Sequence, residues 1–298
     1  MQIDRNLHDD EYLALASFLQ ENPQILLRAF GFDQEMAKLE FLRWFPSLRK
    51  FSLAGLHHVT TLEGLRYLPA DLAYLDLGET AHALDLEPAM RFERLRTLRV
   101  VQHVKGLVDL LQVNKELRAL ALWRHSLDGI LQTLELPRLE SLALTLGSLK
   151  SDSWVSRVGD LHYLAVRGTR GVTTVDWVRK LRSLKWLWLD DLSKVGRLPD
   201  LSANVELLRV DLTDMRNLRE ADSLESLRNA PNLEELLITE SRLPVEAFRP
   251  LVDKASLRRV GVGLGSQRRN EDAQTLLARP APSSLTDFSS RIGVIQVV

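Results

Sequence analysis

Residues 117–122 read Leu-Arg-Ala-Leu-Ala-Leu, and this Leu-x-x-Leu-x-Leu frame recurs ten times along a chain of 298 residues. The apolar residues at its fourth and sixth places alternate with their neighbours, as they do in a strand that buries one face. Successive frames begin 21 to 28 residues apart, which is too short for two-helix repeats, so the sequence predicts a solenoid with one strand and a compact return per coil. The frames begin at Leu48, Leu72, Leu95, Leu117, Leu139, Leu161, Leu184, Val205, Leu233 and Leu257.

Composition limits the class of protein. A repeat array grows in one dimension, so we expect the whole length to form one elongated domain. Basic residues (39) and acidic residues (40) nearly balance, so no overall positive field indicates a nucleic-acid partner. The chain has no cysteine, and no run approaches the roughly 18 apolar residues that cross a bilayer. The acidic start lacks the pattern of a secretion signal, so we expect a cytoplasmic protein that does not bind membranes.

The return halves of the coils also carry regularly spaced apolar residues, such as Val172, Val175 and Leu181. Together with the strand frame, this pattern resembles the leucine-rich repeats, specifically the class of about 22 residues seen in internalins and in a regulatory subunit of protein phosphatase. The resemblance covers about residues 48 to 265. It implies an α/β fold, a curved right-handed horseshoe with a parallel β-sheet on the concave side and short helices or irregular turns on the convex side.

One departure from the family concerns the turn after each strand, where leucine-rich repeats usually place asparagine. His103 and His125 occupy equivalent turn places in adjacent coils. They could share one metal ion, but no third ligand is evident, so substitution for the turn asparagine is the favoured interpretation. Gly261-Val-Gly263-Leu-Gly265 is similar to a phosphate loop, but its spacing is wrong and it lies in the last repeat strand, which favours a structural role.

Both ends of the array are expected to be capped, because an open solenoid exposes an apolar cross-section. Residues 1–47 predict a helical N-terminal cap with a helix from Asp10, a second from Asn22 to about Gly31, and a third from Asp33 to Pro46. Residues 48–265 form the repeats. Residues 266–298 predict a helix over 270–278 and an eleventh strand over 292–297.

The strand residues between the leucines should form the concave face. Small residues of the middle coils form its floor there, flanked by Trp123 on one side and by Trp186 and Trp188 on the other. Trp, Tyr and Arg dominate the energetics of protein interfaces, although tryptophans can also pack on their neighbours in the sheet. The predicted partner-binding residues are Trp123, Arg124, Tyr163, Arg167, Trp186, Trp188, Asp190, Arg209 and Asp211.

We therefore predict a non-enzymatic module that binds another protein through its concave face. The resemblance implies a scaffold, adaptor, inhibitor or regulatory subunit, and we expect no cofactor and no metal. The alternative is an enzyme or small-molecule site around Asp190, Asp211 and Trp188, since the frame places the two carboxylates one rung apart. Nucleic acid bound through arginines and aromatic stacking is a third alternative, which the charge balance disfavours. The sequence indicates neither the partner's identity nor the oligomeric state.

Overall fold

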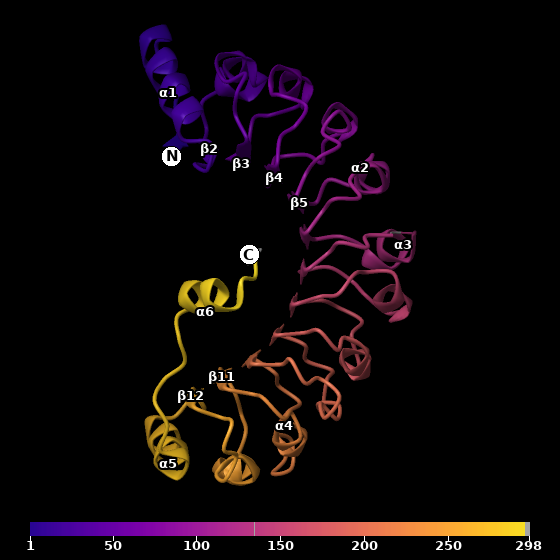
Figure 1. Ribbon diagram of the computed structural model, residues 1–298, viewed down its shortest axis with the longest axis vertical. Coiled ribbons are helices and arrows are strands. Elements are labelled where there is room, and N and C mark those ends of the chain that lie inside the picture. The colour runs from indigo at the N-terminus through magenta and orange to yellow at the C-terminus, as the bar shows by residue number, and fades with distance from the viewer. Residues whose placement is uncertain (134, 296–298) are drawn as a thin grey trace. The chain divides into compact units, whose positions relative to one another are not determined.

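The computed structural model describes residues 1–133 and 135–295 (Figure 1). The chain divides into two compact units. Unit 1 consists of Met1–His125 with Thr133–Arg138, and unit 2 consists of Ser126–Gln132 with Leu139–Val298. We describe each unit by itself, and the predicted single structural domain stays a prediction.

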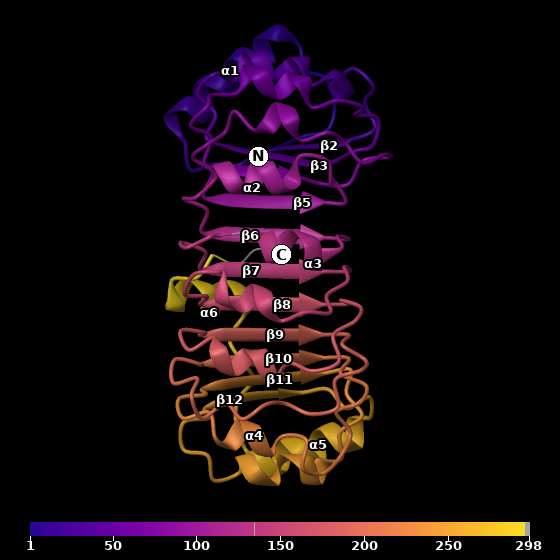
Figure 2. The same cartoon turned by 90° about the vertical axis from the view of Figure 1, so that its right-hand side faces the viewer.

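Unit 1 is a parallel sheet in which each strand pairs with the next one in the sequence (Figure 2). Its strands are β1 (Gln2–Ile3), β2 (Leu27–Gly31), β3 (Lys50–Leu56), β4 (Tyr74–Leu77), β5 (Thr97–Val101) and β6 (Ala119–Trp123). Its connections contain α1 (Asp9–Glu21), η1 (Met36–Lys38), η2 (Glu40–Trp44), η3 (Glu63–Tyr67), η4 (Glu87–Ala89) and α2 (Leu107–Val113).

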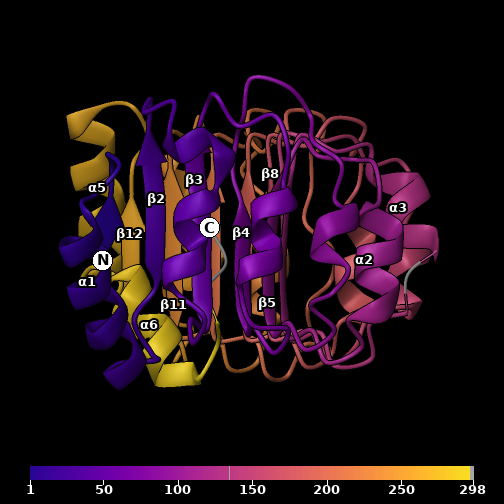
Figure 3. The same ribbon diagram turned by 90° about the horizontal axis from the view of Figure 1, so that it is seen from above.

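Unit 2 repeats this arrangement, and its strands also run parallel, as the view from above in Figure 3 shows. Its strands are β7 (Ser141–Thr145), β8 (Tyr163–Arg167), β9 (Trp186–Asp190), β10 (Arg209–Thr213), β11 (Glu235–Thr239) and β12 (Arg259–Val262). Its other elements are α3 (Leu127–Thr133, whose last residue belongs to unit 1), η5 (Ser153–Ser156), η6 (Asp176–Lys180), α4 (Glu225–Arg228), η7 (Val245–Leu251), α5 (Gln267–Leu277) and α6 (Leu285–Ile292).

The core of each unit lies between the strands and the returns. Frame leucines such as Leu117, Leu120 and Leu122 are fully buried there. The returns cover this face of each sheet, and we call the opposite face the concave face (Figure 1). The predicted α/β leucine-rich repeat architecture is confirmed. None of the helices in the described part of the chain has the length and apolar character needed to cross a bilayer.

The coil of β10 begins two residues later than the sequence predicted. Arg209 pairs with Trp186 of β9, which places the start of the frame at Leu207. Leu207 is fully buried, whereas Val205 is 53% exposed. A shift of two residues preserves the strand alternation, so the pattern alone does not distinguish the two registers.

The corrected register separates the two carboxylates of the predicted alternative site. Asp190 stands beside Thr213, and Asp211 stands beside Trp188. The expectation that Asp190 and Asp211 occupy neighbouring rungs of one ladder is therefore wrong.

The N-terminal cap contains one of the three predicted helices in full. The helix expected from Asp10 is confirmed as α1. The second is wrong, because residues 27–31 form strand β2, in which buried and exposed residues alternate. The third is replaced by the short helices η1 and η2.

The C-terminus also differs from the prediction. The helix expected over 270–278 is confirmed as α5. The eleventh strand is wrong in its described part, because Ile292 ends helix α6 and Gly293–Ile295 are not in a strand. The hydroxyl of Ser284 begins α6 by accepting a hydrogen bond from the Asp287 N–H. Residues 296–298 of the predicted strand lie outside the described residues.

Candidate functional site

The concave face of unit 2 carries the strand side chains that alternate with the core leucines. Parallel pairing in register brings equivalent residues of adjacent strands to about 4.8 Å from one another, so these side chains form three ladders. The first ladder, at the start of the strands, is Ser141, Tyr163, Trp186, Arg209, Glu235 and Arg259. The second is Ala143, Ala165, Trp188, Asp211, Leu237 and Gly261. The third is Thr145, Arg167, Asp190, Thr213 and Thr239.

The chain after α5 returns to this face and lies along it (Figure 1). The N–H of Val260 in β12 donates to the carbonyl of Pro280 at 2.8 Å, so the segment first pairs with the last strand. Gly261 has no side chain, and an added Cβ would lie 3.0 Å from the ring of Pro282. This glycine gives the returning segment room, in agreement with the structural interpretation of the glycine-rich stretch.

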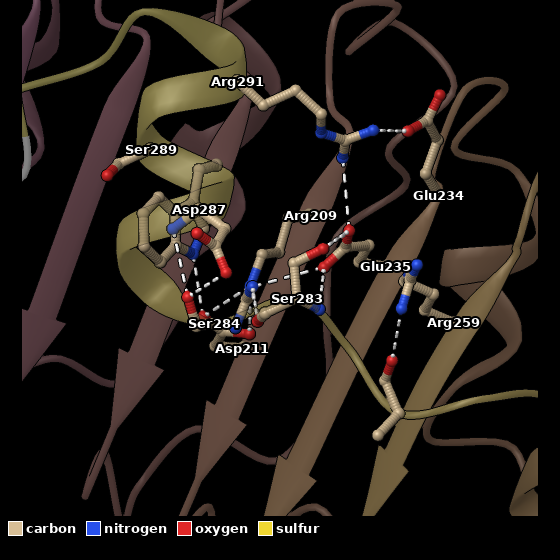
Figure 4. Close-up of polar contacts among 12 residues, drawn as sticks. Arg209, Asp211, Glu234, Glu235, Arg259, Ser283, Ser284, Asp287, Ser289 and Arg291 are labelled. Atoms are coloured by element: carbon tan, nitrogen blue, oxygen red, sulfur yellow. Dashed lines mark hydrogen bonds and ion pairs between the residues drawn. The ribbon is translucent and has the colours of Figure 1, made fainter.

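Polar contacts hold the segment to the first ladder (Figure 4). The carboxylate of Glu235 accepts from the N–H of Ser283 at 2.9 Å and from its hydroxyl at 2.8 Å. Arg209 donates to the carbonyl of Ser283 at 2.9 Å. Side chains of β10 and β11 thus bind the backbone of the segment just before α6 begins.

Helix α6 inserts one aromatic ring into the first ladder. Phe288 is fully buried, and its ring centroid lies 5.3 Å from that of Trp186 in an edge-on arrangement. The guanidinium carbon of Arg209 lies 5.1 Å from the same ring, and that of Arg291 lies 4.8 Å from it. Aromatic and cation–π contacts of this kind contribute about 0.5–1.5 kcal/mol each beyond the area they bury.

Charged groups surround this ring. Arg209 pairs with Asp211 at 2.9 Å and with Glu235 at 3.3 Å, and all three side chains are at most 2% exposed. Arg291 of α6 pairs with the other carboxylate oxygen of Glu235, also at 3.3 Å. Burial raises the pKa of Asp211, although the guanidinium of Arg209 and the indole N–H of Trp186, 2.8 Å away, favour its charged form.

The end of the strands holds a second group of side chains that stays partly open. The guanidinium carbon of Arg167 lies 4.3 Å from the ring centre of Trp188, and its Nε donates to Asp190 at 3.0 Å. The side chains of Arg167 and Asp190 are 26% and 20% exposed. The indole nitrogen of Trp188 has no hydrogen-bond partner among the described residues. We call Arg167, Trp188 and Asp190 the open strip of unit 2.

Unit 1 carries a similar group on its own concave face. The guanidinium carbon of Arg99 lies 4.6 Å from the ring centre of Trp123, and its Nη1 donates to Asp76 at 2.8 Å. The hydroxyl of Ser52 donates to the same carboxylate at 2.6 Å. Within the described ranges, the indole nitrogen of Trp123 likewise has no hydrogen-bond partner.

No protein-family model and no curated protein matches this sequence. Solved structures with a similar fold include an internalin (inlF) from Listeria monocytogenes, with 16% identity, a TM-score of 0.49, and coverage of 82% of this chain and 76% of that one. Internalin C2 from the same organism shows 19% identity, a TM-score of 0.43, and coverage of 74% and 82%. A leucine-rich repeat protein of Leptospira interrogans shows 16% identity, a TM-score of 0.49, and coverage of 88% and 76%.

The strands, their frame and the returns make both units leucine-rich repeats. The repeats place the nine predicted partner-binding residues in two groups. Four of them, in unit 2, are at most 1% exposed, and Phe288 of α6 packs against Trp186, so the expected exposure of Trp186 is wrong and packing on its neighbours describes it better. The other five keep exposed surface, and for them partner binding stays a prediction. The buried group is Tyr163, Trp186, Arg209 and Asp211. The remaining group is Trp123, Arg124, Arg167, Trp188 and Asp190.

The two turn histidines of unit 1 bond to the repeat backbone. His103 accepts from the N–H of Leu84 at 3.0 Å through Nδ1, and its Nε2 lies 3.0 Å from the carbonyl of Gly78. His125 Nε2 lies 3.2 Å from the carbonyl of Val100. Burial lowers the pKa of both imidazoles. These contacts agree with substitution for the turn asparagine of the repeats.

Sequence reasoning missed the residues that cover the first ladder, which are Ser283, Phe288 and Arg291, and it missed Glu235 beneath them. A partial signal was present, because Phe288 and Arg291 stand three residues apart and share one face of a helix. The direction in which the chain returns after Pro280 carries no such signal. The burial of Trp186 therefore could not be predicted from the repeat that contains it.

Proposed function

We propose that this chain is a non-enzymatic protein-interaction module that binds a partner protein through the open strip of its concave face. The observation that carries the proposal is the pairing of Trp188 with Arg167, whose guanidinium Asp190 holds over the indole. Trp and Arg are the residues most enriched at the energetic centres of interfaces. A preoriented arginine loses less conformational entropy on binding than a free one. Such a module acts as a scaffold, adaptor, inhibitor or regulatory subunit.

The alternative of a catalytic carboxylate pair has weaker support. Asp211 is buried against Arg209 and Trp186, and Asp190 is held by Arg167. An acid and base pair needs two carboxylates that both reach a substrate.

A chain without cysteine suits a reducing compartment, and the cytoplasm is the location that we propose.

A photocrosslinking experiment tests the proposal. Thr213 stands beside Asp190 and is partly exposed, so a photoreactive amino acid at position 213 reports contacts at the open strip. The protein captured there is identified by mass spectrometry and then titrated with purified wild-type chain by calorimetry. We expect Trp188→Ala to raise the dissociation constant of this complex by about 30-fold, as for an interface hot spot worth ~2 kcal/mol.

Arg167→Ala should weaken binding in the same direction, and Arg197→Ala on an exposed return of the same unit is the matched control. Circular dichroism verifies that each variant keeps its fold. If a partner bound the Trp188→Ala and Arg167→Ala chains as tightly as it binds the wild type, the open strip would not be its binding site.

A further inference from the structure

Helix α6 lies away from the end of the repeat array. The last strand, β12, is already covered by α5, which packs against β12 and η7. The chain then continues through residues 279–284 and turns back over the concave face, where α6 lies apart from α5 (Figure 1). Repeat arrays need a cap at each end, and α5 supplies this one. The position of α6 therefore calls for another explanation.

The repeats of unit 2 do not need α6 for their core. Strand residues alternate between two faces, so the core residues Leu187, Leu189 and Val210 lie on the side of the sheet opposite α6. On α6 itself, Phe288 and Ser289 are the buried residues. Undocking α6 would expose the first ladder to water and leave the core leucines in place.

The face under α6 is adapted to a helix with a particular chemistry. Phe288 enters the space between Trp186 and Arg209, and three residues later Arg291 meets the carboxylates of Glu234 at 2.7 Å and Glu235 at 3.3 Å. Residues three apart lie on one face of a helix. The first ladder, together with Glu234 beside it, thus recognises an aromatic ring and a guanidinium at this spacing.

Docking also carries a cost that limits its strength. The covered face buries Arg209, Asp211 and Glu235, and desolvation of such charges offsets much of their mutual attraction. A helix of eight residues such as α6 is marginal on its own, so α6 also loses conformational entropy when it docks. Both terms favour a segment that can leave the face.

We propose that residues 280–295 are an internal ligand of the concave face. A partner helix that presents an aromatic residue and, three residues later, an arginine displaces them and takes their place. The proposal extends the proposed function, on which it rests for the existence of a protein partner. It adds the kind of segment that the partner presents and a closed state in which the first ladder is occupied.

A peptide experiment on the full chain tests the proposal. The double variant Phe288→Ala, Arg291→Glu removes the ring and reverses the charge that hold α6 down. A fluorescent peptide with the wild-type sequence of residues 280–298 is then titrated against it and followed by anisotropy. We expect the double variant to bind this peptide at least tenfold more tightly than the wild-type chain does, because in the wild type the tethered segment competes at high effective concentration.

Two controls make the result specific. Arg268→Glu on the exposed face of α5 changes the same charge without touching the concave face, and it should bind the peptide as weakly as the wild type. A peptide carrying Phe288→Ala should lose at least tenfold in affinity for the double variant. Glu234→Arg, added to a chain that carries Phe288→Ala and Arg291→Ala, should weaken binding of the wild-type peptide, and a peptide carrying Arg291→Glu should recover that loss. This background leaves the tethered segment no charge at position 291 to pair with the new guanidinium.

Hydrogen exchange on the unmodified chain gives an independent measurement. If α6 leaves the face while the repeats stay folded, its amides exchange faster than those of β9 and β10, which open only with the unit. Equal protection of α6 and these strands, or a double variant that does not bind the wild-type peptide, would overturn the proposal. Neither experiment uses the partner, so such a failure would leave partner binding at Trp188 untouched.

Discussion

At the residue scale, the concave faces of both units share a stacked pair of arginine and tryptophan, with an aspartate that holds the arginine. Each arginine is oriented before any partner arrives, which lowers the entropy lost on binding. One of the three groups, that of Trp186, is completed by Phe288 of α6. This contact shows that the arrangement of arginine and tryptophan accepts an aromatic ring. The three groups are Arg99, Trp123 and Asp76; Arg167, Trp188 and Asp190; and Arg209, Trp186 and Asp211.

A buried turn histidine gives a residue-scale prediction about pH. Burial lowers the pKa of His103, so the folded chain keeps it neutral at a pH where the unfolded chain binds a proton. Its contribution to the free energy of unfolding is complete above the ordinary histidine pKa of about 6.5 and falls as pH drops below that value. We expect His103→Asn, which restores the usual repeat residue, to reduce the loss of stability between pH ~7 and ~5.

Urea denaturation of both chains across this pH range measures the effect, and NMR titration of the His103 ring reports its pKa directly. His82→Asn, at an exposed histidine of the same unit, is the matched control and should leave the loss of stability in place. An identical pH dependence for His103→Asn and the wild type would contradict the prediction.

The sequence identified the tryptophans of the concave face but did not give their exposure. The alternation over residues 184–189 requires Trp186 and Trp188 to point away from the core. Both do, since Trp186 contacts Phe288 and Trp188 contacts Arg167 on the concave face. Exposure depends on what covers that face, and Phe288 reaches Trp186 from a distant part of the chain. A repeat pattern describes contacts between neighbouring coils and holds no information about such a return.

At the scale of elements, the repeats were predictable because each strand uses the same apolar spacing. The helix expected from Asn22 to about Gly31 rests on the start signal Asn22-Pro23 and the glycine near its end, yet burial over Leu27–Gly31 alternates as in any strand. The register of β10 failed for a related reason. Val205 and Leu207 both continue the alternation, and only pairing with β9 distinguishes them.

This register predicts that two similar substitutions have very unequal effects on stability. Leu207 is fully buried, so Leu207→Ala should lower the free energy of unfolding by about 2–4 kcal/mol through the lost apolar contacts and the cavity left behind. Val205 is 53% exposed, so Val205→Ala should change it by less than about 0.5 kcal/mol. Denaturation of the two variants under one set of conditions measures the difference, and a larger loss for Val205→Ala would contradict the register.

At the scale of the whole molecule, charge is the property that separates a protein partner from a nucleic acid. The chain has a net charge of −1, and the arginines stacked on the tryptophans of the concave faces, which are Arg99, Arg167 and Arg209, are already paired with carboxylates. A ligand that meets such pairs displaces few counterions. Binding driven by six to ten phosphate contacts instead loses about 10³ to 10⁵ in affinity between roughly 50 and 200 mM salt.

We therefore expect the affinity for the captured partner to fall less than about tenfold over this salt range. Calorimetric titrations at several salt concentrations measure the slope. A single-stranded oligonucleotide titrated under the same conditions is the comparison, and because Arg167 beside Trp188 is already paired with Asp190 we expect it to bind weakly. A steep salt slope for the partner, together with tight binding of the oligonucleotide that Trp188→Ala abolishes, would turn the open strip into a nucleic-acid site, with the indole acting as a stacking platform.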